Sequence, residues 1–252
     1  MTTEEAIHAR HSVRTYNPVM PDRFVLDYVN DYISDLKPVF PGTDCRLVLI
    51  NKSVDGKIGT YGVVRGAQCY VAVVHRREGE FQAINAGMCG ERLVLGLTGM
   101  GIGTIWLGGT FSGGDVSRAV NPAHDEEIAA LIPFGYPAAR ESLTSRLFSA
   151  VAGSKKRKPF DELFRISPDS PFRKGLELMR LAPSAQNKQG WRAVEADGIL
   201  HFFSASDSRF AMLDMGIGLE HFIVGATAGK WKKLDVTPPD TRWRYVISRT
   251  AE

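Results

Sequence analysis

Residues 81–99, with the sequence FQAINAGMCGERLVLGLTG, predict a long buried helix, because apolar side chains cover most of its surface. Residues 210–228, FAMLDMGIGLEHFIVGATA, repeat the pattern at an offset of 129. The identical pairs are Phe81 and Phe210, Gly87 and Gly216, Glu91 and Glu220, Gly96 and Gly225, and Thr98 and Thr227. A glycine inside a helix costs about 1 kcal/mol relative to alanine, so matching glycines indicate two closely packed helices, as across a pseudo-twofold axis. Chance similarity between two glycine-rich helices is the alternative.

Helices and strands are expected on both sides of these two helices, which we place at about 80–98 and 208–228. Thr2 and Glu5 form a capping-box pattern that begins a helix ending near His11. Helical spacing of apolar residues begins again after Asp22, and a further helix is expected at about 172–181. Strands are expected at 45–50, 69–75, 104–109, 126–137, 191–196, 200–205 and 243–249.

The composition is that of an ordinary globular protein. The chain has 252 residues, of which 44% are hydrophobic and 23% charged, and its net charge of +3 gives no reason to expect nucleic-acid or membrane partners. Three widely spaced cysteines fit neither a disulfide framework nor a Cys-x-x-Cys metal site, and the histidines form no His-x-x-x-His pair. The N-terminus lacks the apolar segment of a signal peptide, and no apolar run approaches the roughly 20 residues of a membrane span. We therefore expect a soluble cytoplasmic protein without a metal.

The sequence contains two cationic clusters, of which the first is a candidate phosphate site. The stretch ARHSVRTY places Arg10, His11, Ser12 and Arg14 close together, and two guanidinium groups beside a hydroxyl suit a phosphate. The alternative is a solvated basic edge. The run KKRK at 155–158 is the second cluster, for which an exposed charged connector is the alternative.

The stretch APSAQNKQGW (182–191) is rich in turn formers and small polar side chains. Pro183 stiffens it, whereas Ser184, Asn187 and Gln189 supply donors and acceptors for the carbonyls and ring nitrogens of a planar heterocycle. The alternative is a loop that only ends one element and begins the next. No Ser-His-Asp, paired-carboxylate or Walker pattern accompanies these clusters.

Together these motifs resemble those of the FMN-dependent nitroreductase family. RHSVR (10–14) is similar to the Arg-x-Ser-x-Arg/Lys that ends the family's first helix. APSAQNKQGW matches its Ala-Pro-Ser-x-x-Asn-x-Gln-Pro-Trp, except that Gly190 replaces a proline. GMGIGTIWLGG (99–109) and IPFGYP (132–137), followed by the basic segment, also look like family motifs. The similarity spans nearly the whole chain and implies an α+β fold, the nitroreductase-like three-layer sandwich.

The order of the motifs departs from the family. The Pro-Ser-x-x-Asn loop follows the first helix closely in the family, whereas here it comes some 170 residues later. This looks like the variant in which two nitroreductase-like halves are fused in one chain. We expect an N-terminal half at 1–158 and a C-terminal half at 159–252 that supplies the partner wall of the flavin site. The resemblance thus implies a monomer that is an internal pseudo-dimer with one FMN.

The resemblance also implies a set of cofactor-binding residues and no obligatory catalytic side chain, because the flavin carries the chemistry. The set is Arg10, His11, Ser12, Arg14, Leu107, Gly108, Gly109, Lys155, Arg157, Pro183, Ser184, Asn187 and Gln189. Arg10 and Ser12 would hold the FMN phosphate, helped by Lys155 and Arg157. Arg14 would lie near the N1/O2 edge of the ring, where a cation stabilises the anionic reduced flavin.

The remaining roles concern the ring and its reaction. Pro183, Ser184 and Asn187 would line the ring or its dimethylbenzene side, and residues 107–109 would approach N5. The implied activity is NAD(P)H-dependent reduction of a small-molecule electron acceptor such as a nitroaromatic or a quinone. An FMN-binding protein without turnover, which stores or senses flavin, is the alternative, and a structural homologue that binds no flavin is a third. Tyr61 and Arg65 are weaker site candidates.

Overall fold

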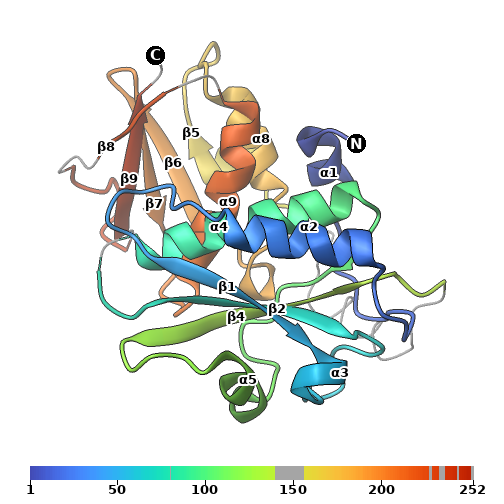
Figure 1. Ribbon diagram of the computed structural model, residues 1–252. Helices are drawn as coiled ribbons and strands as arrows, with labels where there is room; N and C mark the ends of the chain where they lie inside the picture. The colour runs from blue at the N-terminus through green and yellow to red at the C-terminus, as the bar shows by residue number, and fades with distance from the viewer. Residues whose placement is uncertain (80, 140–155, 227–228, 233–235, 243, 251–252) are drawn as a thin grey trace.

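The computed structural model describes residues 1–79, 81–139, 156–226, 229–232, 236–242 and 244–250. It has the α+β fold expected from the sequence, with two β-sheets and helices that pack between and around them (Figure 1). One sheet comes from residues 45–135 and the other from residues 164–250. No helix in the described part of the chain combines the length and the apolar character needed to cross a membrane.

The first sheet is antiparallel and has the strand order β1-β2-β4-β3. Its strands are β1 (Cys45–Asn51), β2 (Cys69–Arg76), β3 (Gly103–Thr104) and β4 (Glu126–Gly135). β2 is buried on both faces: Val71 and Val73 belong to one hydrophobic core, and Ala72 and Val74 belong to the core on the opposite face. This alternation explains why the β2 sequence is a continuous apolar run.

The second sheet has the order β5-β6-β7-β9-β8 and is antiparallel except for the β5–β6 pair. Its strands are β5 (Phe164–Arg165), β6 (Trp191–Ala196), β7 (Ile199–Ser204), β8 (Trp231–Lys232) and β9 (Arg244–Thr250). β6 begins directly after the 182–190 stretch, so the sheet fixes one end of that loop.

The helices cover both faces of the first sheet and one face of the second. The α-helices are α1 (Thr3–Ala9), α2 (Arg23–Ser34), α3 (Lys52–Asp55), α4 (Gln82–Gly99), α5 (Gly113–Val120), α7 (Phe160–Leu163), α8 (Arg173–Arg180) and α9 (Ala211–Gly225). In Figure 1, α2 and α4 lie on one face of the first sheet, and α3 and α5 lie on the other. The predicted caps are present: Thr2 and Glu5 form a complete capping box, and Asp22 caps α2.

Helices α4 and α9 pack closely where Gly87 meets Gly216, as the repeated pattern predicted, whereas the other matching pair lies elsewhere: Gly96 approaches Tyr28, and Gly225 approaches Leu178 and Lys174. A Cβ atom on Gly87 would overlap the Leu213 carbonyl oxygen and approach the Gly216 Cα to 3.1 Å. A Cβ atom on Gly216 would overlap the Ile84 carbonyl oxygen. Only glycine permits this backbone approach. Both helices therefore contain a glycine at the contact despite its cost to helix stability.

Three sequence predictions about strands and helices need correction. β1 is an edge strand in which only Leu47 and Ile50 are buried, whereas the sequence predicted a buried strand. The strand expected at 104–109 is reduced to the two residues of β3, because only Leu107 continues the pairing, with Leu131. The helix α5 was not predicted, since it is short and begins with two glycines.

The packing of α4 on α9 leads to a prediction about stability. We expect Gly216→Ala to lower the free energy of unfolding by about 3 kcal/mol or more, because overpacking against backbone cannot be relieved by a side-chain movement. Gly114→Ala is the control: Gly114 is exposed in α5, and nothing lies within 4 Å of its added Cβ. That change should stabilise by up to about 1 kcal/mol. Equal effects of the two changes in urea unfolding would contradict the close packing.

Candidate functional site

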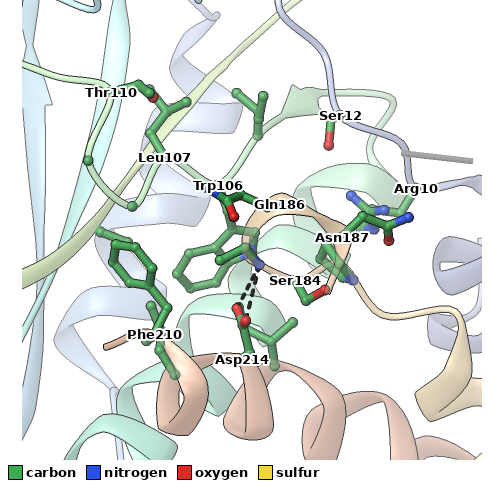
Figure 2. Close-up of a pocket in the computed structure, with 18 of the residues that line it drawn as sticks. Arg10, Ser12, Trp106, Leu107, Thr110, Ser184, Gln186, Asn187, Phe210 and Asp214 are labelled. Atoms are coloured by element: carbon green, nitrogen blue, oxygen red, sulfur yellow. Dashed lines mark hydrogen bonds between the residues drawn. The ribbon is translucent and has the colours of Figure 1, made fainter. Parts of the chain in front are cut away.

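A cavity of about 330 Å³ lies where four segments meet: the chain after α1, the chain after β3, the loop before β6, and the start of α9 (Figure 2). Its lining residues are Arg10, Ser12, Arg14, Ile105, Trp106, Leu107, Gly108, Gly109, Thr110, Ala130, Arg157, Pro183, Ser184, Ala185, Gln186, Asn187, Phe210, Leu213, Asp214 and Ile217. Both the N-terminal cationic motif and the Pro-Ser-x-x-Asn motif therefore line one cavity of the same chain.

Arginines form one wall of the cavity. The Arg10 side chain is 5% exposed, and its Nε has no hydrogen-bond partner, with Glu91 Oε1 4.0 Å away. Burial lowers the pKa of Arg10, and burial together with the nearby Arg10 and Arg180 lowers the pKa of Arg157. Ser12 is held beside them by a backbone bridge to Thr104. Buried guanidinium groups that face a cavity with an unused donor fit an anion such as a phosphate.

The loop from Pro183 to Gln189 forms a second wall, which adjoins the arginines, because Arg157 Nη1 donates to Asn187 Oδ1 at 3.4 Å. Gln186, Asn187 and Gln189 have φ values of 53°, 55° and 48°, a left-handed conformation that is uncommon for residues other than glycine. Hydrogen bonds hold this conformation: Gln189 N donates to Ser184 Oγ at 2.9 Å, and Asn187 Nδ2 donates to the Lys156 carbonyl at 2.9 Å. Such strained backbone conformations cluster at functional sites.

The segment from Trp106 to Thr110 forms a third wall, and it meets α9 at a close contact. A Cβ atom on Gly108 would lie 2.8 Å from the Phe210 ring, so any other residue there would have to displace this ring. Arg209 Nη2 donates to the Gly108 carbonyl at 3.1 Å, and its guanidinium lies 4.5 Å from the centre of the Phe210 ring. These contacts of Gly108 with Arg209 and Phe210 hold the third wall against the start of α9.

A buried carboxylate on α4 connects three of the surrounding segments. Glu91 is fully buried; it accepts from Trp106 Nε1 at 2.7 Å and lies 2.8 Å from His221 Nε2. Arg10 is the third neighbour, at 4.0 Å. Glu91 therefore orients both an aromatic ring and a guanidinium group that line the cavity.

A second ion pair mirrors the contact between Glu91 and His221. On the repeated pattern, Glu91 corresponds to Glu220 and Arg92 to His221. Glu220 accepts from Arg92 Nε at 2.8 Å and from Arg92 Nη2 at 3.0 Å. On each helix, the residues at these two positions thus contact the residues at the same two positions of the other helix. The partner of the glutamate differs: it is His221 for Glu91 and Arg92 for Glu220.

Asp214, at the start of α9, is the only acidic residue among the described residues that line the cavity. Both of its carboxylate oxygens face the Ala185 N–H, at 3.0 and 3.1 Å (Figure 2). Burial raises the pKa of Asp214 to about 7, and the hydrogen bond from Ala185 and the charge of Lys188 oppose this shift only in part. Asp214 thus holds the loop and titrates near neutral pH.

The structure brings most of the candidate residues to the cavity. Those that line it are Arg10, Ser12, Arg14, Leu107, Gly108, Gly109, Arg157, Pro183, Ser184 and Asn187. His11 does not, because its exposed ring turns back towards the Ala9 carbonyl, 3.2 Å from Nδ1. Gln189 is buried behind the loop, where it accepts from Lys158 N. Lys155 lies outside the described residues.

Other residues of the site were missed or misplaced by the sequence analysis. Tyr61 and Arg65 do not line this cavity; Tyr61 is exposed, and Arg65 pairs through its backbone with Thr15. The site residues not named from the sequence include Trp106, Gln186, Phe210 and Asp214. The repeated pattern was the sequence feature that could have drawn attention to two of these residues, because it aligns Asp214 with Asn85 and Phe210 with Phe81.

Comparisons with known proteins give a consistent result. A model of the family described as "Putative TM nitroreductase" matches residues 2–226. The structure of a "putative nitroreductase" from Thermotoga maritima is 24% identical in sequence with a TM-score of 0.62, and the match covers 99% of this chain and 92% of that one. A nitroreductase with bound FMN from Bacteroides fragilis is 17% identical with a TM-score of 0.44, covering 57% and 92%. The comparison with curated proteins gave no match.

The burial of Asp214 leads to a prediction about stability and pH. Between the usual pKa of an aspartate and about 7, the folded protein holds one proton more than the unfolded chain, so stability falls as pH rises through this range. The full cost, present above pH 7, is on the order of 4 kcal/mol, because one pKa unit corresponds to about 1.4 kcal/mol. Asp214→Asn keeps an acceptor for Ala185. We expect its stability relative to the wild type to rise between about pH 4 and pH 7 and to stay constant above pH 7.

Denaturant unfolding at several pH values measures this gain. Asp207→Asn is the matched control, because Asp207 is an exposed acid that does not line the cavity. Its stability relative to the wild type should stay constant over the same range. A constant difference for Asp214→Asn as well would show that burial does not keep the carboxyl protonated.

Proposed function

Because the chain belongs to this nitroreductase family, we propose that it is an FMN-dependent oxidoreductase that uses NAD(P)H to reduce a nitroaromatic, a quinone or a similar small acceptor. The observation that carries the proposal is the meeting of Arg10, Ser12 and Arg157 with the Pro183–Asn187 loop around one cavity. When bound, FMN would supply the hydride transfer, and the protein would supply binding and electrostatics.

The residues at the cavity fit an FMN. The unpartnered Nε of Arg10 and the nearby guanidinium of Arg157 suit its phosphate, and Ser12 adds a hydroxyl. Lys155 is proposed for the same role. The only described acid at the cavity, Asp214, has a raised pKa, so it does not balance the arginine charges at neutral pH as an exposed aspartate would.

The ring-binding roles follow from the other walls. We assign Arg14 to the N1/O2 edge of the ring, where its charge would favour the reduced state. Pro183, Ser184 and Asn187 would line the dimethylbenzene side. Residues 107–109 would lie near N5, since they form the wall between β3 and Phe210.

The proposal includes the division into an N-terminal half at 1–158 and a C-terminal half at 159–252. Two observations support it: each half contains its own sheet, and one chain contributes both walls of the cavity. A chain that completes its own site does not need a partner subunit. We therefore propose a cytoplasmic monomer that acts as an internal pseudo-dimer with one FMN.

Cofactor titration tests the phosphate site. We expect FMN to bind about 100-fold or more tightly than riboflavin, because a hydrogen bond to a charged group contributes about 1.5–3 kcal/mol and several converge here. Ser12→Asp should weaken FMN binding by roughly 10- to 100-fold through charge repulsion and leave riboflavin binding nearly unchanged. Ser117→Asp, at an exposed position of α5, is the control. Equal affinities for FMN and riboflavin would remove the phosphate role, and no binding of either would refute the proposal.

Turnover is tested with the FMN-loaded protein. We expect NADH or NADPH to bleach the oxidised flavin absorption under anaerobic conditions, and a quinone to restore it. The reason is that the cavity leaves apolar surface from Trp106, Leu107 and Phe210 beside the proposed ring, against which a planar acceptor can stack. Stopped-flow absorbance measures both steps. Failure of both pyridine nucleotides to bleach the flavin would instead support FMN binding without turnover.

A further inference from the structure

The further inference concerns Asp214 and rests on the function proposed above. Asp214 lies in the first turn of α9 and lines the cavity beside Trp106 and Phe210 (Figure 2). The side chain is 8% exposed and is the only carboxyl among the described lining residues, which include three arginines. A buried acid at a ligand cavity is costly and needs an explanation beyond packing.

Holding the loop does not require an acid at this position. Asn85, the residue that corresponds to Asp214 on α4, accepts from Val39 N at 2.7 Å in the same way that Asp214 accepts from Ala185 N. The side-chain amide of Asn85 therefore accepts a backbone hydrogen bond at the corresponding position of α4 without an acid. The carboxyl of Asp214 differs from this amide because it can bind and release a proton.

The surroundings of Asp214 favour its neutral form. Within the part of the chain that the structure describes, the N–H group of Ala185 alone donates to the two carboxylate oxygens, so most of their acceptor capacity is unused there. The charged and titratable groups around it are Lys188 on the loop, Arg10, Arg14 and Arg157 at the cavity, Arg209 next to Phe210, and Glu91 and His221 at the contact between α4 and α9. Among these groups, Lys188 carries a charge that lowers the pKa of Asp214, and burial outweighs it.

We propose that Asp214 is a catalytic residue that binds a proton when electrons enter the cavity and donates it to the bound acceptor. Reduction of a quinone to a quinol needs one hydride and one proton. The cofactor would supply the hydride. The O–H bond of Asp214 breaks, a new O–H bond forms on the quinone carbonyl oxygen, and the carboxylate then takes a proton from water.

Proton uptake on reduction follows from electrostatics. Electrons entering the cavity add negative charge beside Asp214, and a like charge favours the protonated form of a carboxyl. The proton affinity of Asp214 should therefore be higher in the reduced than in the oxidised protein. By linkage, the reduction potential must then depend on pH more steeply between the pKa of Asp214 in the oxidised protein and its pKa in the reduced protein than outside this range.

The test is the pH dependence of the reduction potential of the FMN-loaded protein, measured by equilibration with reference dyes. We expect the wild type to take up about one more proton per electron pair above about pH 7 than Asp214→Asn does. Asp207→Asn, the exposed control, should behave as the wild type. In quinone reduction, the rate of the wild type should fall roughly tenfold per pH unit at high pH, and this fall should be absent in Asp214→Asn, whose rate should be low throughout.

The possible outcomes distinguish a failure of this inference from a failure of the proposed function. Identical potentials for the wild type and Asp214→Asn at every pH would overturn the role of Asp214, even where FMN binds and is reduced. So would a quinone-reduction rate in Asp214→Asn equal to that of the wild type. Absence of FMN binding or of its reduction in the wild type would instead overturn the proposed function.

Discussion

The approach of α4 to α9 at Gly87 and Gly216 is the contact on which the cavity depends. With no Cβ on either side, the two backbones come close enough for side chains on one helix to reach past the other. Glu91 on α4 can then contact His221 on α9, and its second oxygen remains available for Trp106. The start of α9 is brought under the loop before β6 by the same packing, which places Asp214 against Ala185.

This packing also explains how one chain can contribute both walls of a single cavity. The cationic segment follows α1 and pairs with β3, whereas the polar loop leads into β6 of the other sheet. The two segments are separated by some 170 residues in sequence, and only the crossing of the central helices brings them together. The segments that line the cavity are thus anchored to helices and strands, and the strained backbone at Gln186 and Asn187 is held by hydrogen bonds to its neighbours.

Local patterns in the sequence were enough to predict the helices α1, α2, α4, α8 and α9, the capping box, the contact between Gly87 and Gly216, and the two motifs that line the cavity. Other features depend on contacts that a local pattern does not contain. Residues 104–109 contain an apolar run typical of a strand, but beyond Thr104 only Leu107 pairs with β4, and Trp106 lines the cavity. The burial of Asp214 depends on the loop packed over it, a contact between segments that are distant in the sequence.

The mirrored pairs Glu91–His221 and Glu220–Arg92 show what covalent linkage of the two central helices permits. In a dimer of identical subunits, every substitution at the twofold axis occurs twice, so a change that improves one site alters its copy as well. Here the codons for residues 85 and 214, or for 92 and 221, can vary separately. One face of the crossing can therefore carry an acid and an imidazole, Asp214 and His221, while the other carries an amide and a guanidinium, Asn85 and Arg92.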